Sequence, residues 1–238
     1  MNKEKGTSKK FNKYVGTIEK NGYRLLRMVN NIIDLTKIDS ESFDLNLKNC
    51  NIFSLINNIY YSLKYYFANK NRKLNFNYNC QKVIIACDPV NIERIILNLL
   101  SNSIKYTKGG DTITINIKKM KEYIEISVKD TGVGIKKEKR KVIFDNFRQA
   151  DESFSRPTEG SGMGLKIVKS LVELHNGNIS LKSTYGEGSA FIIKLPNKQL
   201  PEEKTKNIDL SRNLIDRYNM EFSDIFGGNI KNISSSHI

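Results

Sequence analysis

A stripe of apolar residues runs for about seven helical turns near the start of the chain. Between positions 11 and 38, apolar side chains recur at the three- and four-residue spacing of one helix face. These residues are Phe11, Tyr14, Val15, Ile18, Leu25, Leu26, Val29, Ile32 and Ile33. The pattern predicts a long amphipathic helix whose stripe is too wide to remain in water, so the helix needs a partner. Since no second long helix precedes it, we expect the partner to come from another chain or from sequence outside this one.

Composition places the chain among globular proteins. It has 238 residues, a mass of 27.3 kDa, 39% hydrophobic and 27% charged residues, and a formal charge of +14. The charge admits a polyanion partner, but no aromatic-basic motif accompanies it, so we expect a lysine-rich solvated surface and no nucleic acid. No apolar run reaches the ~18–20 residues of a membrane span. The three cysteines, at positions 50, 80 and 87, form no C-x-x-C pair, which favours a reducing, cytoplasmic setting without a disulfide framework or a zinc site.

Helical and strand patterns alternate after position 43 and predict an α+β domain at about 43–197. Strands are expected at 43–47, 74–78, 83–85, 112–117, 123–128, 179–183 and 190–195. Helices are expected at 52–68, 88–107 and 163–175, with a short one around 137–144. Residues 1–10 are expected to be a disordered lead. The tail, 198–238, is charged and then weakly amphipathic; it either docks on the domain or is disordered.

The helix predicted at 88–107 carries an unusual polar stripe. At 100° per residue, Asn91, Asn98, Asn102 and Lys105 fall within one narrow sector. Amide oxygens can hold Mg²⁺ or its water ligands, and a lysine can meet phosphate oxygens. Taken alone, the stripe is as well explained by a solvent-facing helix surface in an asparagine-rich protein.

Several short motifs suit a nucleotide, although each has a simpler explanation. In segment 130–134, a carboxylate at a strand end can accept a hydrogen bond from an exocyclic amine such as that of adenine, while its glycines allow close approach. The glycines of 160–164, before a helix, expose backbone N–H groups to a phosphate. Phe144 and Phe147 flank a polar loop and suit a lid. The alternatives are an ordinary turn at 130–134, a hinge at 160–164 and core packing for Phe144 and Phe147. Segment 186–189 is most simply explained as a hairpin turn.

In this order and spacing, the motifs resemble the ATP-binding catalytic domain of sensor histidine kinases, within the gyrase/Hsp90/MutL-like ATPase superfamily. The N box is at 98–107, the F box is at 143–148, and the three glycine boxes are at 130–134, 160–165 and 186–189. The resemblance covers 43–197 and implies a two-layer α/β sandwich, with helices on a mixed, mostly antiparallel sheet. Segment 11–42 looks like the second helix of the family's dimerisation and phosphoacceptor hairpin, with the first helix absent. It would precede the domain as a long bundle helix.

The resemblance implies ATP and Mg²⁺ as cofactors and assigns roles to residues of the boxes. Asn102 would bind Mg²⁺ with Asn98 nearby, Lys105 would meet phosphate, and Asp130 would take the adenine amine. Residues 145–163 would form a lid. The full set of implied nucleotide-binding residues is Asn98, Asn102, Lys105, Tyr106, Asp130, Gly132, Gly134, Ile135, Phe147, Gly160, Gly162, Met163, Gly164, Leu165 and Ser189.

The implied reaction moves the γ-phosphoryl group of ATP to a histidine, for relay to a response regulator. The only histidines are His175, expected to cap a helix end, and His237 near the terminus, and neither has the neighbours of the family's phosphoacceptor. We therefore expect the chain to act on the phosphoacceptor hairpin of a parent kinase in trans, not to autophosphorylate alone. Hydrolytic relatives carry a glutamate where this chain has Asn98, and an amide cannot take a proton at neutral pH, so efficient hydrolysis is not expected.

The implied partners are the phosphoacceptor hairpin, a response regulator receiver domain and, as one option, a second copy of the chain through 11–42. Membrane attachment of a parent protein is left open. A nucleotide-binding regulatory module without catalysis is the alternative function, and a nucleic-acid binder, suggested only by the +14 charge, ranks last.

Overall fold

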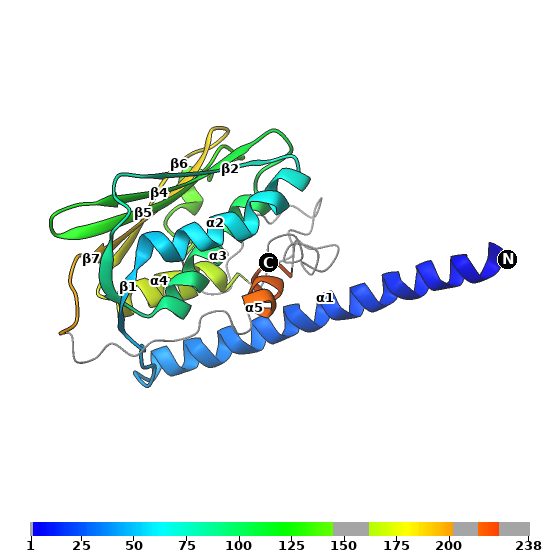
Figure 1. Ribbon diagram of the computed structural model, residues 1–238, viewed down its shortest axis with the longest axis horizontal. Helices are drawn as coiled ribbons and strands as arrows, with labels where there is room; N and C mark the ends of the chain where they lie inside the picture. The colour runs from blue at the N-terminus through cyan, green and yellow to red at the C-terminus, as the bar shows by residue number, and fades with distance from the viewer. Residues whose placement is uncertain (1, 145–161, 202–213, 224–238) are drawn as a thin grey trace.

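A layer of helices covers one face of a mixed sheet in the computed structural model, which describes residues 2–144, 162–201 and 214–223 (Figure 1). Within these residues the main sheet has five strands, in the order β2, β4, β5, β7 and β6. Strand β2 is parallel to β4, and every other neighbouring pair is antiparallel. The strands are β2 (Lys73–Tyr78), β4 (Thr112–Lys119), β5 (Tyr123–Asp130), β6 (Asn178–Thr184) and β7 (Gly188–Pro196). The expected α+β sandwich on a mixed, mostly antiparallel sheet is confirmed.

Helices α2 (Ile52–Asn69), α3 (Pro89–Lys105) and α4 (Gly164–Leu174) form the layer against the sheet (Figure 1). The apolar side of α3 is almost fully removed from water, and alternate residues of β4 and β5 meet this layer. On α3, the buried residues are Ile92, Ile95, Ile96, Leu99, Leu100 and Ile104, none more than 3% exposed. Full burial of one such side chain contributes roughly 1.5–3 kcal/mol. The apolar face holds α3 in place, and its polar stripe faces away from the sheet.

The start of α3 is held by side chains from two other parts of the fold. Asp88 caps the helix, because its Oδ1 accepts hydrogen bonds from the backbone N–H groups of Val90 (3.0 Å) and Asn91 (3.1 Å). The backbone N–H of Asp88 donates to Nε2 of His175 (3.0 Å), while Nδ1 of His175 lies 2.7 Å from the carbonyl oxygen of Leu171 and donates to it. His175 therefore ties the end of α4 to the start of α3, which confirms its expected structural role.

His175 should make the stability of the protein fall as the solution is acidified. Burial lowers the pKa of its imidazole, against smaller opposing effects of the Leu171 carbonyl and the Asp88 carboxylate. Below the ordinary pKa of about 6.5, the unfolded chain takes up this proton more readily than the folded one, so protonation favours unfolding. We expect the free energy of unfolding in urea to decrease between pH 7 and pH 5, and to decrease less in H175Q. Equal pH dependence in the two proteins would contradict this assignment.

Helix α1 (Asn2–Asp39) confirms the expected long helix but begins earlier than expected. Residues 2–10 are helical, so the prediction of a disordered lead is wrong; lysine and glutamate favour helix there, and no proline occurs before Pro89. Most of the apolar stripe stays in solvent: Ile18 is 71% exposed and Leu25 is 64% exposed. Among the described residues, nothing in this chain covers that stripe.

Two short elements differ from expectation. The first strand, β1 (Lys48–Asn51), lies later than the predicted 43–47, because it pairs antiparallel with β3 (Ile84–Cys87). The helix predicted around 137–144 is a single 3-10 turn, η1 (Lys137–Lys139). Its sequence carries five basic residues between 136 and 141, and repulsion between like charges opposes a regular helix there.

Part of the tail docks on the molecule. Helix α5 (Leu214–Glu221) lies between α1 and α3 (Figure 1). Tyr218 is 3% exposed, and Phe222, just after the helix, is fully buried with its ring edge-on to Tyr66 at 6.1 Å. Of the two alternatives expected for the tail, residues 214–223 therefore show docking. Within the described part of the chain, no helix has both the length and the apolar character needed to cross a bilayer.

Candidate functional site

The polar stripe of α3 brings two amide side chains to one side of the helix, one turn apart. Asn98 is buried, while Asn102 and Lys105 are half-buried. The Nδ2 group of Asn98 donates to the backbone carbonyl of Arg94 (3.1 Å) and to the carboxylate of Glu221 (2.8 Å). Its other amide atom, Oδ1, lies against Gly164 so closely that a Cβ there would come within 2.7 Å. The N box and the second glycine box are therefore in direct contact.

Asp130 ends β5 as a buried carboxyl group. Its Oδ1 accepts a hydrogen bond from the backbone N–H of Gly132 (3.0 Å), and its register partner on β7 is Ser189. Burial raises the pKa of Asp130, against the lowering effect of backbone N–H groups from Gly132 and Ser189, while Asp111 adds a smaller raising effect. The protein thus keeps a costly buried carboxyl group at the end of a strand, and such groups concentrate at functional sites.

Glycines hold the loop after Asp130 against its neighbours. A Cβ on Gly132 would lie 2.1 Å from the carbonyl oxygen of Tyr106, and one on Gly134 would lie 2.0 Å from that of Thr184. Gly134 also has φ of +65°, which favours glycine. The backbone N–H of Val133 donates to the same Tyr106 carbonyl (3.1 Å). This contact joins the first glycine box to the end of the N box.

The third glycine box, at the start of β7, contacts Asp130 at the end of β5. Gly188 has φ of +120°, and a Cβ there would lie 2.1 Å from the carbonyl oxygen of Asp130. Ser189 is buried, with Oγ 3.0 Å from Oγ of Ser183, which in turn accepts a hydrogen bond from the backbone N–H of Ile135 (2.8 Å). Ser189 and Ile135 are thereby linked through one hydroxyl group.

The structure describes some of the remaining predicted site residues but not all of them. Met163, before α4, is 1% exposed, Leu165 is half-buried against the core, and Gly162 has φ of +69°. Phe144 of the F box packs edge-on against Phe191 at 6.3 Å. Phe147, Gly160 and most of the expected lid, at 145–161, lie outside the described residues.

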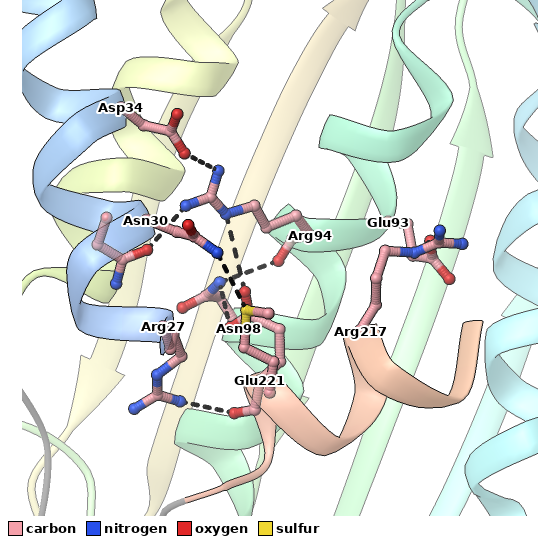
Figure 2. A network of polar contacts seen from close by, with 10 residues as sticks. Arg27, Asn30, Asp34, Glu93, Arg94, Asn98, Arg217 and Glu221 are labelled. Carbon is pink, nitrogen blue, oxygen red and sulfur yellow. Dashed lines mark hydrogen bonds and ion pairs between the residues drawn. The ribbon is translucent and has the colours of Figure 1, made fainter. Parts of the chain in front are cut away.

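A polar network lies on the N-terminal side of Asn98 (Figure 2). The sequence analysis did not predict it. Arg94 of α3 donates to the carboxylate of Asp34 and to the amide oxygen of Asn31 (2.7 Å) on α1, and its Nε lies 3.7 Å from Glu221 on α5. The amphipathic pattern of the tail was a signal for a helix. It carries no information on which surface that helix covers, so the pairing of Glu221 with Asn98 could not be read from it.

The sequence of this domain matches that of a known family. Residues 87–199 match the family described as histidine kinase-, DNA gyrase B- and HSP90-like ATPases. This part of the chain is similar to the ATPase domains of that family. The match runs from the start of α3 to just beyond β7 and so contains every glycine contact described above.

Around the ATPase domain, the similarity extends to sensor histidine kinases. The chain is 32% identical over 200 residues to the circadian input-output histidine kinase CikA of Synechococcus elongatus, which covers 82% of this chain. It spans only 26% of the length of that relative. The family resemblance expected from the boxes is therefore confirmed.

Solved structures of histidine kinases share the fold. Full-length ShkA in complex with AMPPNP superposes with a TM-score of 0.67 at 24% identity, over 77% of this chain and 38% of that one. The histidine kinase ThkA in complex with the response regulator TrrA gives 0.56 at 20% identity, over 82% of this chain and 62% of that one. At these identities the likeness concerns the fold.

Proposed function

We propose that this chain is the ATP-binding part of a two-component sensor histidine kinase. It transfers the γ-phosphoryl group of ATP to a histidine on a phosphoacceptor hairpin supplied in trans, for relay to a response regulator. One observation carries the proposal: the second glycine box lies against Asn98 of α3, the first lies against Tyr106 at the end of α3, and the third lies against the buried Asp130.

The Asp130 side of the site suits adenine. A carboxylate at the end of β5 can accept a hydrogen bond from the exocyclic amine, and its burial excludes competing water. Without side chains, Gly132 and Gly134 let the backbone pack closely against Tyr106 and Thr184, which fixes the loop beside Asp130. Asp130 thus selects the base, and the loop sets its plane.

The Asn98–Asn102 side suits a divalent cation and phosphates. Amide oxygens are ligands that Mg²⁺ accepts, and the Gly164 backbone approaches Oδ1 of Asn98 where any side chain would collide. Asn102 and Asn98 would hold Mg²⁺, and Lys105 would meet a phosphate. When bound, Mg·ATP supplies the phosphoryl group. The residues of this chain position it and neutralise charge, which is most of what phosphoryl transfer requires of a protein.

Transfer to water is not the proposed reaction. Asn98 stands where a base would have to act, and an amide cannot accept a proton at neutral pH. The neighbouring Glu221 carboxylate is engaged by the Asn98 amide and by Arg94. A carboxylate held between two donors is a poor base for an attacking water molecule.

The phosphoacceptor must come from another chain or segment. His175 is buried, and both of its ring nitrogens are used in hydrogen bonds within the domain. His237 lies outside the described residues. The exposed apolar stripe of α1 is the surface on which an acceptor hairpin, or a second copy of this chain, would pack to complete a helical bundle. A receiver domain as the next partner is supported by the ThkA–TrrA complex.

Incubation with radiolabelled ATP tests the proposal. We expect no label on the chain alone and label on an intact phosphoacceptor hairpin added to it. Label on the chain alone would contradict the need for an acceptor in trans. Tight nucleotide binding with no transfer to any supplied hairpin would favour a regulatory module that binds nucleotide without catalysis.

A further inference from the structure

Helix α5 places a carboxylate from the tail on the first asparagine of the N box (Figure 2). Oε2 of Glu221 accepts a hydrogen bond from Nδ2 of Asn98 at 2.8 Å, across 123 positions of sequence. Both side chains are buried: Glu221 is 5% exposed and Asn98 is 7% exposed. Burying a carboxylate is costly unless it has hydrogen-bond or ionic partners, and Asn98 is one of the partners of Glu221.

This contact decides which way the Asn98 amide faces. An amide nitrogen has two hydrogens to donate, and the backbone carbonyl of Arg94 and the Glu221 carboxylate take them. The opposite orientation would put Oδ1 against two other oxygen atoms, which is repulsive. Oδ1 is therefore turned toward Gly164 and the second glycine box. Only the oxygen of an amide can bind a hard cation, so the orientation determines whether Asn98 can serve as a ligand.

Glu221 is held in position by a docked helix, not by a flexible chain end. Its backbone carbonyl accepts a hydrogen bond from Nη1 of Arg27 on α1 (2.7 Å). One turn earlier, Arg217 pairs with the buried carboxylate of Glu93 on α3 at 2.8 Å. Phe222, which follows Glu221, is fully buried. The carboxylate therefore reaches Asn98 from a surface already fixed by apolar and ionic contacts.

We propose that Glu221 is a positioning residue for the divalent cation: it turns the Asn98 amide oxygen toward the metal without touching the metal itself. The inference rests on the proposed function. It also gives the tail a task, because α5 completes the cation side of a site that otherwise lies within 87–199. Partners that orient metal ligands typically change metal affinity by 10–100-fold when removed.

Calorimetry with AMPPNP, a non-hydrolysable ATP analogue, on the full chain tests the proposal in MgCl₂ and in EDTA. We expect E221A to weaken binding ~10-fold in MgCl₂ and to leave binding in EDTA unchanged, because only the cation contact depends on the amide. E221Q keeps an oxygen that can accept from Asn98 and should stay within about threefold of the wild type. D216A is the matched control: it removes an exposed α5 carboxylate that accepts from Tyr23 on α1, away from Asn98.

Three results would overturn the proposal. If E221A loses affinity equally in MgCl₂ and EDTA, Glu221 merely supports the fold. If E221A binds Mg·AMPPNP as tightly as the wild type, or more tightly, α5 either has no influence on the site or competes with the ligand. If the wild-type chain binds no AMPPNP in either buffer, the proposed function fails as well, which separates that failure from failure of the inference alone.

Discussion

Replacing Asp130 with asparagine is expected to reduce nucleotide affinity by about 100-fold, because it exchanges a buried acceptor for a donor. The remaining oxygen of the amide would keep the hydrogen bond from the Gly132 N–H (3.0 Å), so its NH₂ group would face the adenine amine. Loss of a hydrogen bond to a charged group costs about 1.5–3 kcal/mol, and an unpaired buried donor adds to that. Since about 1.4 kcal/mol corresponds to a tenfold change in affinity, these two losses together amount to about 100-fold.

The same substitution should leave the fold at least as stable. Burial raises the pKa of Asp130, so above the ordinary pKa of 3.8 the ionised carboxylate is less favourable in the folded chain than in the unfolded one. A neutral amide removes that penalty at pH 7. Lower stability of D130N in urea at this pH would contradict the sign. The pH dependence follows from the same shift: wild-type affinity for nucleotide should fall on acidification through the raised pKa.

Calorimetry with AMPPNP measures the change in affinity, and D111N is the matched control. Asp111 lies near Asp130 and influences its pKa, but its carboxylate accepts hydrogen bonds from the backbone N–H of Lys108 and the hydroxyl of Thr131. D111N therefore removes one neighbouring charge and should bind nucleotide nearly as the wild type does. Binding by D130N within threefold of the wild type would mean that the carboxylate does not contact the base.

Local chemistry made much of the fold predictable. The Asp88-Pro89 pair predicts a capped helix start, and the structure places the carboxylate on the first free N–H groups of α3. Alternating residues in β4 and β5 predict which side chains enter the core, and the burial pattern of both strands follows that alternation. In each case the determining contacts lie within a few residues of the signal.

Features decided by distant contacts could not be predicted in the same way. The position of β1 depends on where β3 begins, and the identity of the surface beneath α5 depends on Glu93, Arg94 and Asn98 together. The sequence-based prediction placed Asn98 near the cation and gave it no contact with the tail. In the described residues, the Asn98 nitrogen donates to the Arg94 carbonyl and to Glu221 of the tail, so the oxygen is the atom that can face the site.

Replacing Gly132 with alanine should destabilise the protein and impair nucleotide binding together, because the added methyl group has no space. A Cβ at this position would lie 2.1 Å from the carbonyl oxygen and 2.9 Å from the carbonyl carbon of Tyr106, and 3.0 Å from the Asp130 carboxylate. The first two obstacles are backbone atoms at the end of α3, so no side-chain rotation relieves the clash. Overpacking of this kind costs about 1–3 kcal/mol, and more when backbone must move.

G22A separates this effect from the general consequence of changing a glycine. Gly22 lies within α1, and a Cβ there meets nothing within 4 Å, so the alanine variant should gain about 1 kcal/mol from helix propensity. Urea unfolding should thus shift in opposite directions for the two variants, and only G132A should lose affinity for AMPPNP. If G132A were as stable as the wild type, the loop after Asp130 could not lie against Tyr106. The placement of Asp130 beside the N box would then be wrong, because that loop contact joins the end of β5 to the end of α3.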